Sequence, residues 1–221
     1  MTGGLRSPFL FTRDNLRDTL MANINHSSLT DPKLHEPKGV AAAASGQVYV
    51  ADGSASGDWK YLPVGWGNYQ DGGSAQTITT ADTLLQNNGA GSATSEAYLP
   101  REIRGTSSLW DTTNDKILPI NLGDSYMVRV DLHITAESGS PTEVILQLDI
   151  GGSGSTATVP IITTYMDTGR TTPYTLKASF PVFCGSTFVA NKGQIYLNTD
   201  SGTVTVTNPQ VFITMLSSGS I

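Results

Sequence analysis

Apolar and polar residues alternate along much of the chain after residue 46, as they do in β-strands that bury one face. The clearest alternation covers residues 124–136. Its apolar positions are Tyr126, Val128, Val130, Leu132 and Ile134. The positions between them are Met127, Arg129, Asp131, His133 and Thr135. One side of this strand is therefore predicted to face the core, and the other side to face water or an interface.

Similar alternation predicts further strands, separated by segments rich in Gly, Ser and Asp. These strands are expected at residues 76–80, 97–100, 109–118, 143–150, 159–166, 174–183, 187–190, 194–198 and 203–216. The segments 151–155 and 200–202 are predicted to be turns. Roughly eight to ten short strands predict an all-β fold, a jelly-roll-like antiparallel β-sandwich.

A separate hairpin is predicted before the sandwich. Residues 47–51 alternate, residues 52–58 are rich in Gly, Ser and Asp, and residues 59–62 alternate again. The loop lacks the regular acidic spacing and the terminal glutamate of a calcium loop, so a glycine-rich tip is favoured over a metal site. The expected organisation is an arm at 1–46, a hairpin and connector at 47–66, and a sandwich at 67–221.

The first 46 residues have no strand periodicity. A helix is expected at 12–25, and its apolar face would carry Leu16, Leu20, Met21 and Ile24. The pairs Asp31-Pro32 and Glu36-Pro37 then disfavour a continuous helix, because the residue before a proline is extended. The segment is predicted to be an extended N-terminal arm with at most one short helix. It either docks on a partner or is a disordered leader.

Composition narrows the classes of partner. Charged residues make up only 14% of the chain, and 13 Lys and Arg against 19 Asp and Glu give a net charge of −6. Such a balance disfavours nucleic acid, because a nucleic-acid binder must neutralise phosphates. No apolar stretch approaches the roughly 18 residues of a membrane-spanning helix, and no secretion signal is expected. The single cysteine, Cys184, excludes an intrachain disulfide.

The residues that could carry catalysis do not form a motif. Of the three histidines, His26 and His35 lie in the arm and His133 lies on the polar side of a strand. Cys184 follows an apolar run at 180–183 with no adjoining cation, which favours a buried, inert thiol. Phosphate-binding, zinc-protease and paired-cysteine motifs are absent from the sequence. We therefore expect no catalytic residue, no cofactor and no metal site.

Two groups of residues keep other functions open. The tryptophans Trp59, Trp66 and Trp110 could line a carbohydrate-binding face, although a place in the core or in a subunit interface is favoured. Two acidic residues could also act as a pair in glycoside cleavage. The candidates for such a pair are Asp111, Asp115, Asp124, Asp131, Glu143 and Asp149. An enzyme acting on surface polysaccharide is the least favoured alternative.

Several segments resemble virion proteins of tailed bacteriophages. The run 35–40, followed by alanines, the strand 47–53 and Trp59, resembles the N-terminal segment of such proteins. The runs 145–152, 180–183 and 188–197 are similar to trimeric jelly-roll modules of phage capsid decoration proteins and fibres. Together these segments extend over most of the chain.

The resemblance implies a homotrimer whose arm grips the major capsid protein of the phage shell. The arm residues expected to bind are Leu16, Leu20, Ile24, His35, Pro37, Lys38 and Val40. The implied function is that of a non-enzymatic capsid decoration (cement) or head-fibre protein on the capsid exterior, present in the host cytoplasm during assembly. The alternative is a tail fibre or receptor-binding protein that recognises a host surface glycan.

Overall fold

A computed structural model describes residues 42–51, 54, 57–73, 75–138, 141, 143–152, 158–167 and 172–219. The helix expected at 12–25 lies outside these residues. So do all the arm residues expected to bind a partner, namely Leu16, Leu20, Ile24, His35, Pro37, Lys38 and Val40. The chain divides into two units, residues 1–60 and residues 61–221, which are described separately below.

The first unit contains the predicted hairpin. Strands β1 (Gln47–Ala51) and β2 (Gly57–Tyr61) form a two-stranded sheet. The rings of Tyr49 and Trp59 meet edge to face with centroids 5.4 Å apart, and the Gln47 side chain donates a hydrogen bond to the Trp59 carbonyl at 3.2 Å. The second strand begins two residues earlier than the alternation suggested and ends one residue earlier.

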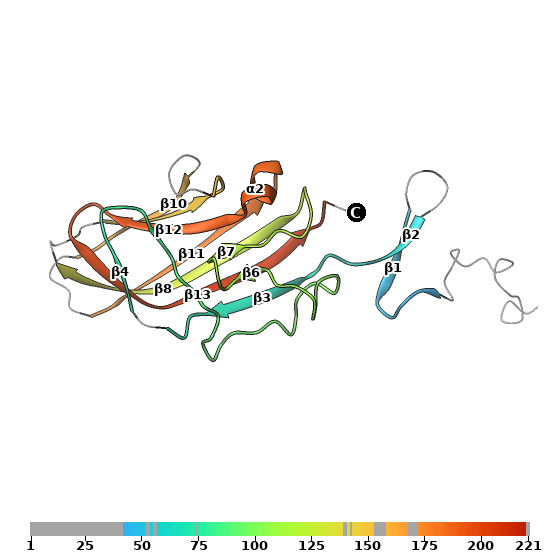
Figure 1. Cartoon of the computed structure of the whole chain (residues 1–221), viewed down its shortest axis with the longest axis horizontal. Coiled ribbons are helices and arrows are strands. Elements are labelled where there is room, and N and C mark those ends of the chain that lie inside the picture. The colour runs from blue at the N-terminus through green and yellow to red at the C-terminus, as the bar shows by residue number, and fades with distance from the viewer. Residues whose placement is uncertain are drawn as a thin grey trace, which may run out of the picture. The chain divides into compact units, whose positions relative to one another are not determined.

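The second unit is built from two antiparallel sheets that face one another (Figure 1). In the first sheet the strand order is β11-β8-β13-β3, and β4 also pairs with β13. These strands are β3 (Gly65–Gln70), β4 (Gln76–Ile78), β8 (Ser125–Ser138), β11 (Tyr174–Phe183) and β13 (Thr203–Ser217).

The second sheet has the order β10-β9-β12-β7-β6, and β5 also pairs with β12. Its strands are β5 (Thr83–Leu84), β6 (Trp110–Asp111), β7 (Lys116–Ile117), β9 (Glu143–Asp149), β10 (Thr158–Tyr165) and β12 (Gly193–Thr199). The predicted all-β, jelly-roll-like antiparallel sandwich is thereby confirmed.

The core lies between the two sheets and follows the alternation in the sequence. In β11, every second side chain from Leu176 to Val182 is buried, and the side chains between them are exposed. Val130 of the first sheet and Leu146 and Ile195 of the second are fully buried. Each such aliphatic side chain stabilises the fold by about 1.5–3 kcal/mol, so the sandwich is held mainly by these inward positions.

The buried carboxylate of Asp124, directly before β8, binds the segment that follows β13. Oδ2 of Asp124 accepts hydrogen bonds from the backbone of Ile120 (3.2 Å) and Asn121 (2.6 Å) and from the Tyr126 hydroxyl (2.8 Å). Its Oδ1 accepts one from the Gly219 backbone at 3.0 Å. Four donors converge on one carboxylate, which compensates the cost of burying its charge.

Some predicted strands are wrong. The short apolar run 187–190 forms part of helix α2 (Ser186–Asn191), in which Phe188 is buried. A run of four apolar residues cannot distinguish a buried strand from a buried helical turn. Residues 97–100 form turns, and 109–118 is two short strands, β6 and β7, joined by a turn in which Asp115 has a φ of 54°. Strands β3 and β5 were not predicted.

Candidate interaction surface

The outward face of the sheet β11-β8-β13-β3 carries a regular array of side chains. The pairing registers of these four strands align their outward residues in rows across the sheet. One row is Pro181, Met127, Thr214 and Trp66. The next row is Ser179, Arg129, Phe212 and Asn68. A third row is Lys177, Asp131, Gln210 and Gln70. We call this array the outer face.

A stack of rings crosses the outer face. The Trp66 ring lies between Tyr98, with centroids 4.8 Å apart and planes at 25°, and Phe212, at 5.0 Å and 27°. The Arg129 guanidinium, also on the outer face, lies over the Phe212 ring, 5.1 Å from its centroid. Both faces of the Trp66 ring are therefore occupied by neighbouring rings. What Trp66 offers to a partner is mainly its ring edge.

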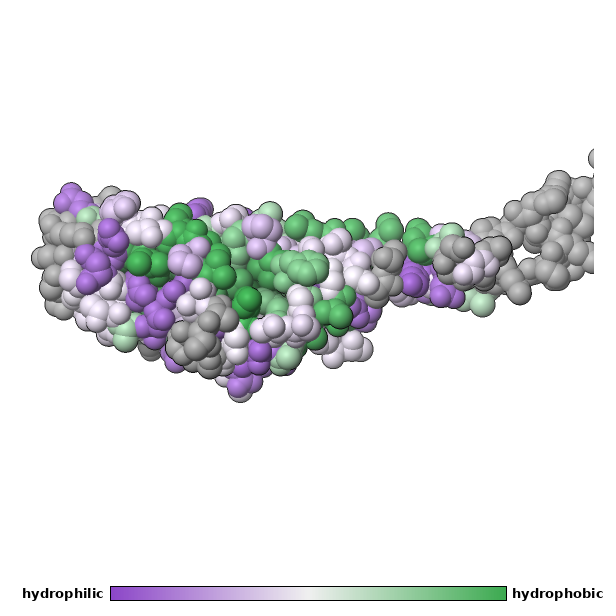
Figure 2. Space-filling model, turned by 90° about the horizontal axis from the view of Figure 1, so that it is seen from above, coloured by the Kyte–Doolittle hydropathy of each residue, from purple (hydrophilic) through white to green (hydrophobic). Residues whose placement is uncertain are grey.

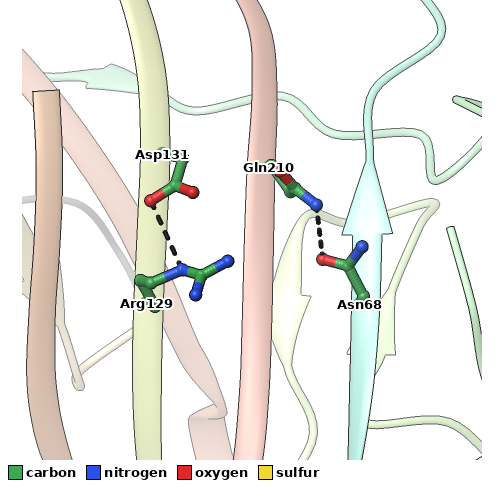
Figure 3. A network of polar contacts seen from close by, with 4 residues as sticks. All are labelled: Asn68, Arg129, Asp131 and Gln210. Atoms are coloured by element: carbon green, nitrogen blue, oxygen red, sulfur yellow. Dashed lines mark hydrogen bonds and ion pairs between the residues drawn. The ribbon is translucent and has the colours of Figure 1, made fainter. Parts of the chain in front are cut away.

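Polar contacts fix the side chains beside the stack (Figure 3). The Nε of Arg129 lies 3.4 Å from Oδ1 of Asp131, an oxygen with no hydrogen-bond partner, so this ion pair compensates its charge. The Arg129 side chain is 45% exposed and the Asp131 side chain 17%. The Gln210 amide donates to Oδ1 of Asn68 at 2.9 Å, and the Asn68 amide donates to the Ala93 carbonyl at 2.6 Å. The Gln210–Asn68 hydrogen bond links β13 to β3 across the face.

Hydrophobic side chains gather at one end of this sheet. Among the described residues, eight large hydrophobic side chains are exposed, and six of them lie where β3 begins, β8 begins, and β11 and β13 end. The six are Leu62, Val64, Tyr98, Leu122, Phe183 and Leu216. We call this group the apolar end. The remaining two, Val159 and Tyr165, lie on β10 of the other sheet.

The opposite end of the outer face is polar. His133 is exposed there, and β8 continues to Thr135 and Glu137. Thr175 and Thr207 flank His133 on the neighbouring strands. The space-filling view, seen from above the view of Figure 1, shows that hydrophobic side chains also interrupt the hydrophilic surface of the larger unit on that side (Figure 2). Contiguous apolar patches larger than a few hundred Å² are typical of interaction sites.

The three tryptophans lie in different environments. Trp66 is on the outer face, whereas Trp110 is buried in the core and its Nε1 donates a hydrogen bond to the Asn87 carbonyl at 2.9 Å. Trp59 belongs to the hairpin. Because Trp110 is buried, the three tryptophans do not together line a carbohydrate-binding surface. Sequence reasoning missed Phe183 and Leu216 as surface residues, although each stands at an outward position of an alternating strand.

Two hollows are lined by residues outside the three rows of the outer face. One, of about 290 Å³, is lined in part by Asp71, Asn88 and Asp115, and burial raises the pKa of Asp115, with Asp71 adding to the shift. The other is an open groove of about 700 Å³ lined in part by Glu96 and Arg104. In the described part of the chain, no three His, Cys, Asp or Glu residues are grouped to hold a metal ion. No helix in that part is long and apolar enough to cross a membrane.

No family model matches the sequence, and no curated protein matches it. Among solved structures, the chain is similar to Eiger TNF from S. frugiperda, with 8% identity, a TM-score of 0.42, and coverage of 71% of this chain and 95% of that one. It is also similar to the PRD1 vertex protein P5, with 13% identity, a TM-score of 0.44, and coverage of 86% and 90%. A third similar structure comes from the Gx strain of infectious bursal disease virus, with 11% identity, a TM-score of 0.24, and coverage of 78% and 38%.

Proposed function

We propose that this chain is a non-enzymatic structural protein of a tailed-phage virion, a homotrimeric capsid decoration or head-fibre protein. The observation that supports an assembly role is the apolar end, an exposed apolar surface on a well-packed β-sandwich. The resemblance of residues 35–53 to the N-terminal segments of phage virion proteins supports a place for this chain in a phage virion. The arm at 1–46 then docks on the major capsid protein, on the exterior of the shell.

The mechanism is stabilisation by mass action. A protein that binds the assembled shell, but not its separated subunits, shifts the equilibrium toward the assembled state. Three copies in one trimer bring three arms to the shell, so each docked arm raises the effective concentration of the others. An arm rich in proline and small residues can lie along a partner through backbone and small apolar contacts.

The test compares the full chain with a variant that lacks residues 1–46. Both are added to emptied or expanded capsids, and the bound fraction is measured by co-sedimentation. We expect the full chain to bind and the truncated chain to lose binding, because the docking residues are gone. Tyr165→Ser, far from the arm in the sequence, serves as the matched control and should bind normally. An unchanged bound fraction for the truncated chain would overturn the proposal.

A receptor-binding tail fibre is the alternative function. Such a protein would bind a host glycan, and the number of copies in each virion would be small rather than in the hundreds. Sugars bind proteins largely by stacking on exposed ring faces, whereas both faces of the Trp66 ring are already covered. Locating the density of this protein in images of the intact virion distinguishes the capsid from the tail.

A further inference from the structure

We infer that the outer face and the apolar end are buried against a second copy of this chain. The inference rests on the homotrimer of the proposed function and names the surface that makes it. The partner is a neighbouring subunit of the same trimer.

The exposed apolar area approaches what a stable interface needs. The six side chains of the apolar end are from 52% to 68% exposed. Two of them are aromatic, with about 150–250 Å² each when fully exposed, and four are smaller aliphatic groups, so together they offer on the order of 500 Å² of apolar surface. A stable interface needs about 800 Å² from each partner. The half-buried Trp66, Met127 and Phe212 of the adjoining outer face would be covered by the same contact and add to this area.

The stacked rings at Trp66 favour a protein partner over a sugar. Trp66 lies between Tyr98 and Phe212, so it presents mainly a ring edge outward. A flat sugar ring therefore finds little to stack on at Trp66, while protein side chains pack well against ring edges. Because the rings hold one another in place, little side-chain entropy is lost when a protein covers them.

Charges of opposite sign lie on the two sides of this sheet. On the β11 side of the sheet, Lys177 is exposed beside the row that contains Arg129. On the β3 side, Asp71 follows the strand directly and lies within electrostatic reach of Asp115, which in turn is close to Asp111. Two opposite charges at opposite edges of one sheet allow the β3 side of one copy to meet the β11 side of the next. Such a head-to-tail contact closes into a ring when the rotation permits.

The test measures the mass of the purified full chain by light scattering coupled to size exclusion, over a range of concentrations. We expect the mass of three copies for the natural chain. The double variant Phe183→Ser and Leu216→Ser removes two large groups from the apolar end. The dissociation constant of its self-association should rise about 100-fold or more. Tyr165→Ser is the matched control, because Tyr165 is 74% exposed but lies on β10. Its mass should stay unchanged.

The contact between opposite charges is tested by varying the salt concentration. Lys177→Ala should weaken self-association at low salt, and the difference from the natural chain should shrink as salt screens the contact. Near-ultraviolet circular dichroism of each variant checks that the sandwich is intact, since all four substituted side chains are exposed.

Three outcomes would overturn the inference. These are a monomeric natural chain at all concentrations, an unchanged mass for the Phe183 and Leu216 variant, and glycan binding that this variant abolishes. None of them depends on the capsid. If the arm truncation did not affect capsid binding, the proposed function would instead be contradicted. The mass of the isolated protein would still test whether a second copy covers the outer face and the apolar end.

Discussion

At the scale of single residues, Asp124 has the largest predicted effect on stability. Asp124→Asn places an amide donor where the carboxylate now faces only donors, the backbone of Ile120, Asn121 and Gly219 among them. We expect the free energy of unfolding to fall by about 2–3 kcal/mol. Urea denaturation followed by circular dichroism measures it. The exposed carboxyl of Glu102 provides the control, since Glu102→Gln should change stability by less than about 0.5 kcal/mol. Equal effects of the two substitutions would contradict the role of Asp124.

Because of Cys184, the free energy of unfolding is expected to fall at alkaline pH. Burial, with a smaller effect from Asp124, raises the pKa of its thiol to about 12, whereas an unfolded thiol has a pKa of about 8.5. Above the unfolded value, the unfolded chain loses a proton that the native chain keeps, so the free energy of unfolding falls as pH rises. The loss from this thiol should reach roughly 2 kcal/mol between pH 8.5 and 10.

Urea midpoints measured from pH 7 to 10 test this expectation. Cys184→Ala should be less stable at pH 7, because it leaves a cavity, but its stability should fall less steeply with pH. Burial also raises the pKa of Tyr69 and of Tyr126, so a residual decline in the same direction is expected for both proteins near pH 10. Identical slopes for the two proteins would show that Cys184 does not cause the decline.

At the scale of elements, helix α2 and strand β12 meet at a glycine. A Cβ on Gly193 would lie 2.5 Å from two ring atoms of the buried Phe188. Gly193→Ala should therefore destabilise the protein by about 1–3 kcal/mol through overpacking. Gly185, at the start of the same helix, has φ −70° and open space around its Cβ position. Gly185→Ala should change stability by no more than about 0.5 kcal/mol. Thermal unfolding of both variants compares them directly, and equal losses would contradict the packing argument.

The long strands could be predicted from sequence because they bury one face along their whole length. Strand β11 has the predicted bounds, and β8 and β13 differ from theirs by one or two residues. Alternation failed where the local pattern is short or interrupted. Strand β3, with Gly65, Gly67 and Asn68, resembles a turn in composition, and it becomes a strand only because β13 supplies a partner.

The candidate site was less predictable than the fold. The sequence indicated that one side of β8 would face water or an interface, and Arg129, Asp131 and His133 do lie on an exposed face. It did not indicate that Tyr98 would reach Trp66, because that contact joins a turn to a strand more than 30 residues earlier. Nor did it indicate that Phe183 and Leu216 would share one end, which follows from strand register.

At the scale of the whole molecule, the two units differ in the interactions that stabilise them. Among the described residues, all the buried hydrophobic side chains lie within residues 61–221, whereas the hairpin of the first unit consists of two strands. Two strands alone are marginally stable in water. A chain restricted to residues 61–221 should therefore fold, with a melting temperature within about 4 °C of that of the full chain. Calorimetry measures it, and an unfolded fragment would mean that the first 60 residues complete the fold.

The position of Trp66 makes association visible by intrinsic fluorescence. Trp110 is already dry in the core, so its emission should not respond when copies meet. Trp66 stands half-buried between Tyr98 and Phe212 on the outer face, where water still reaches the indole. Covering that face excludes the water and moves the emission of Trp66 toward the blue. Dilution of the unlabelled protein would reverse that shift, giving an optical readout of subunit exchange.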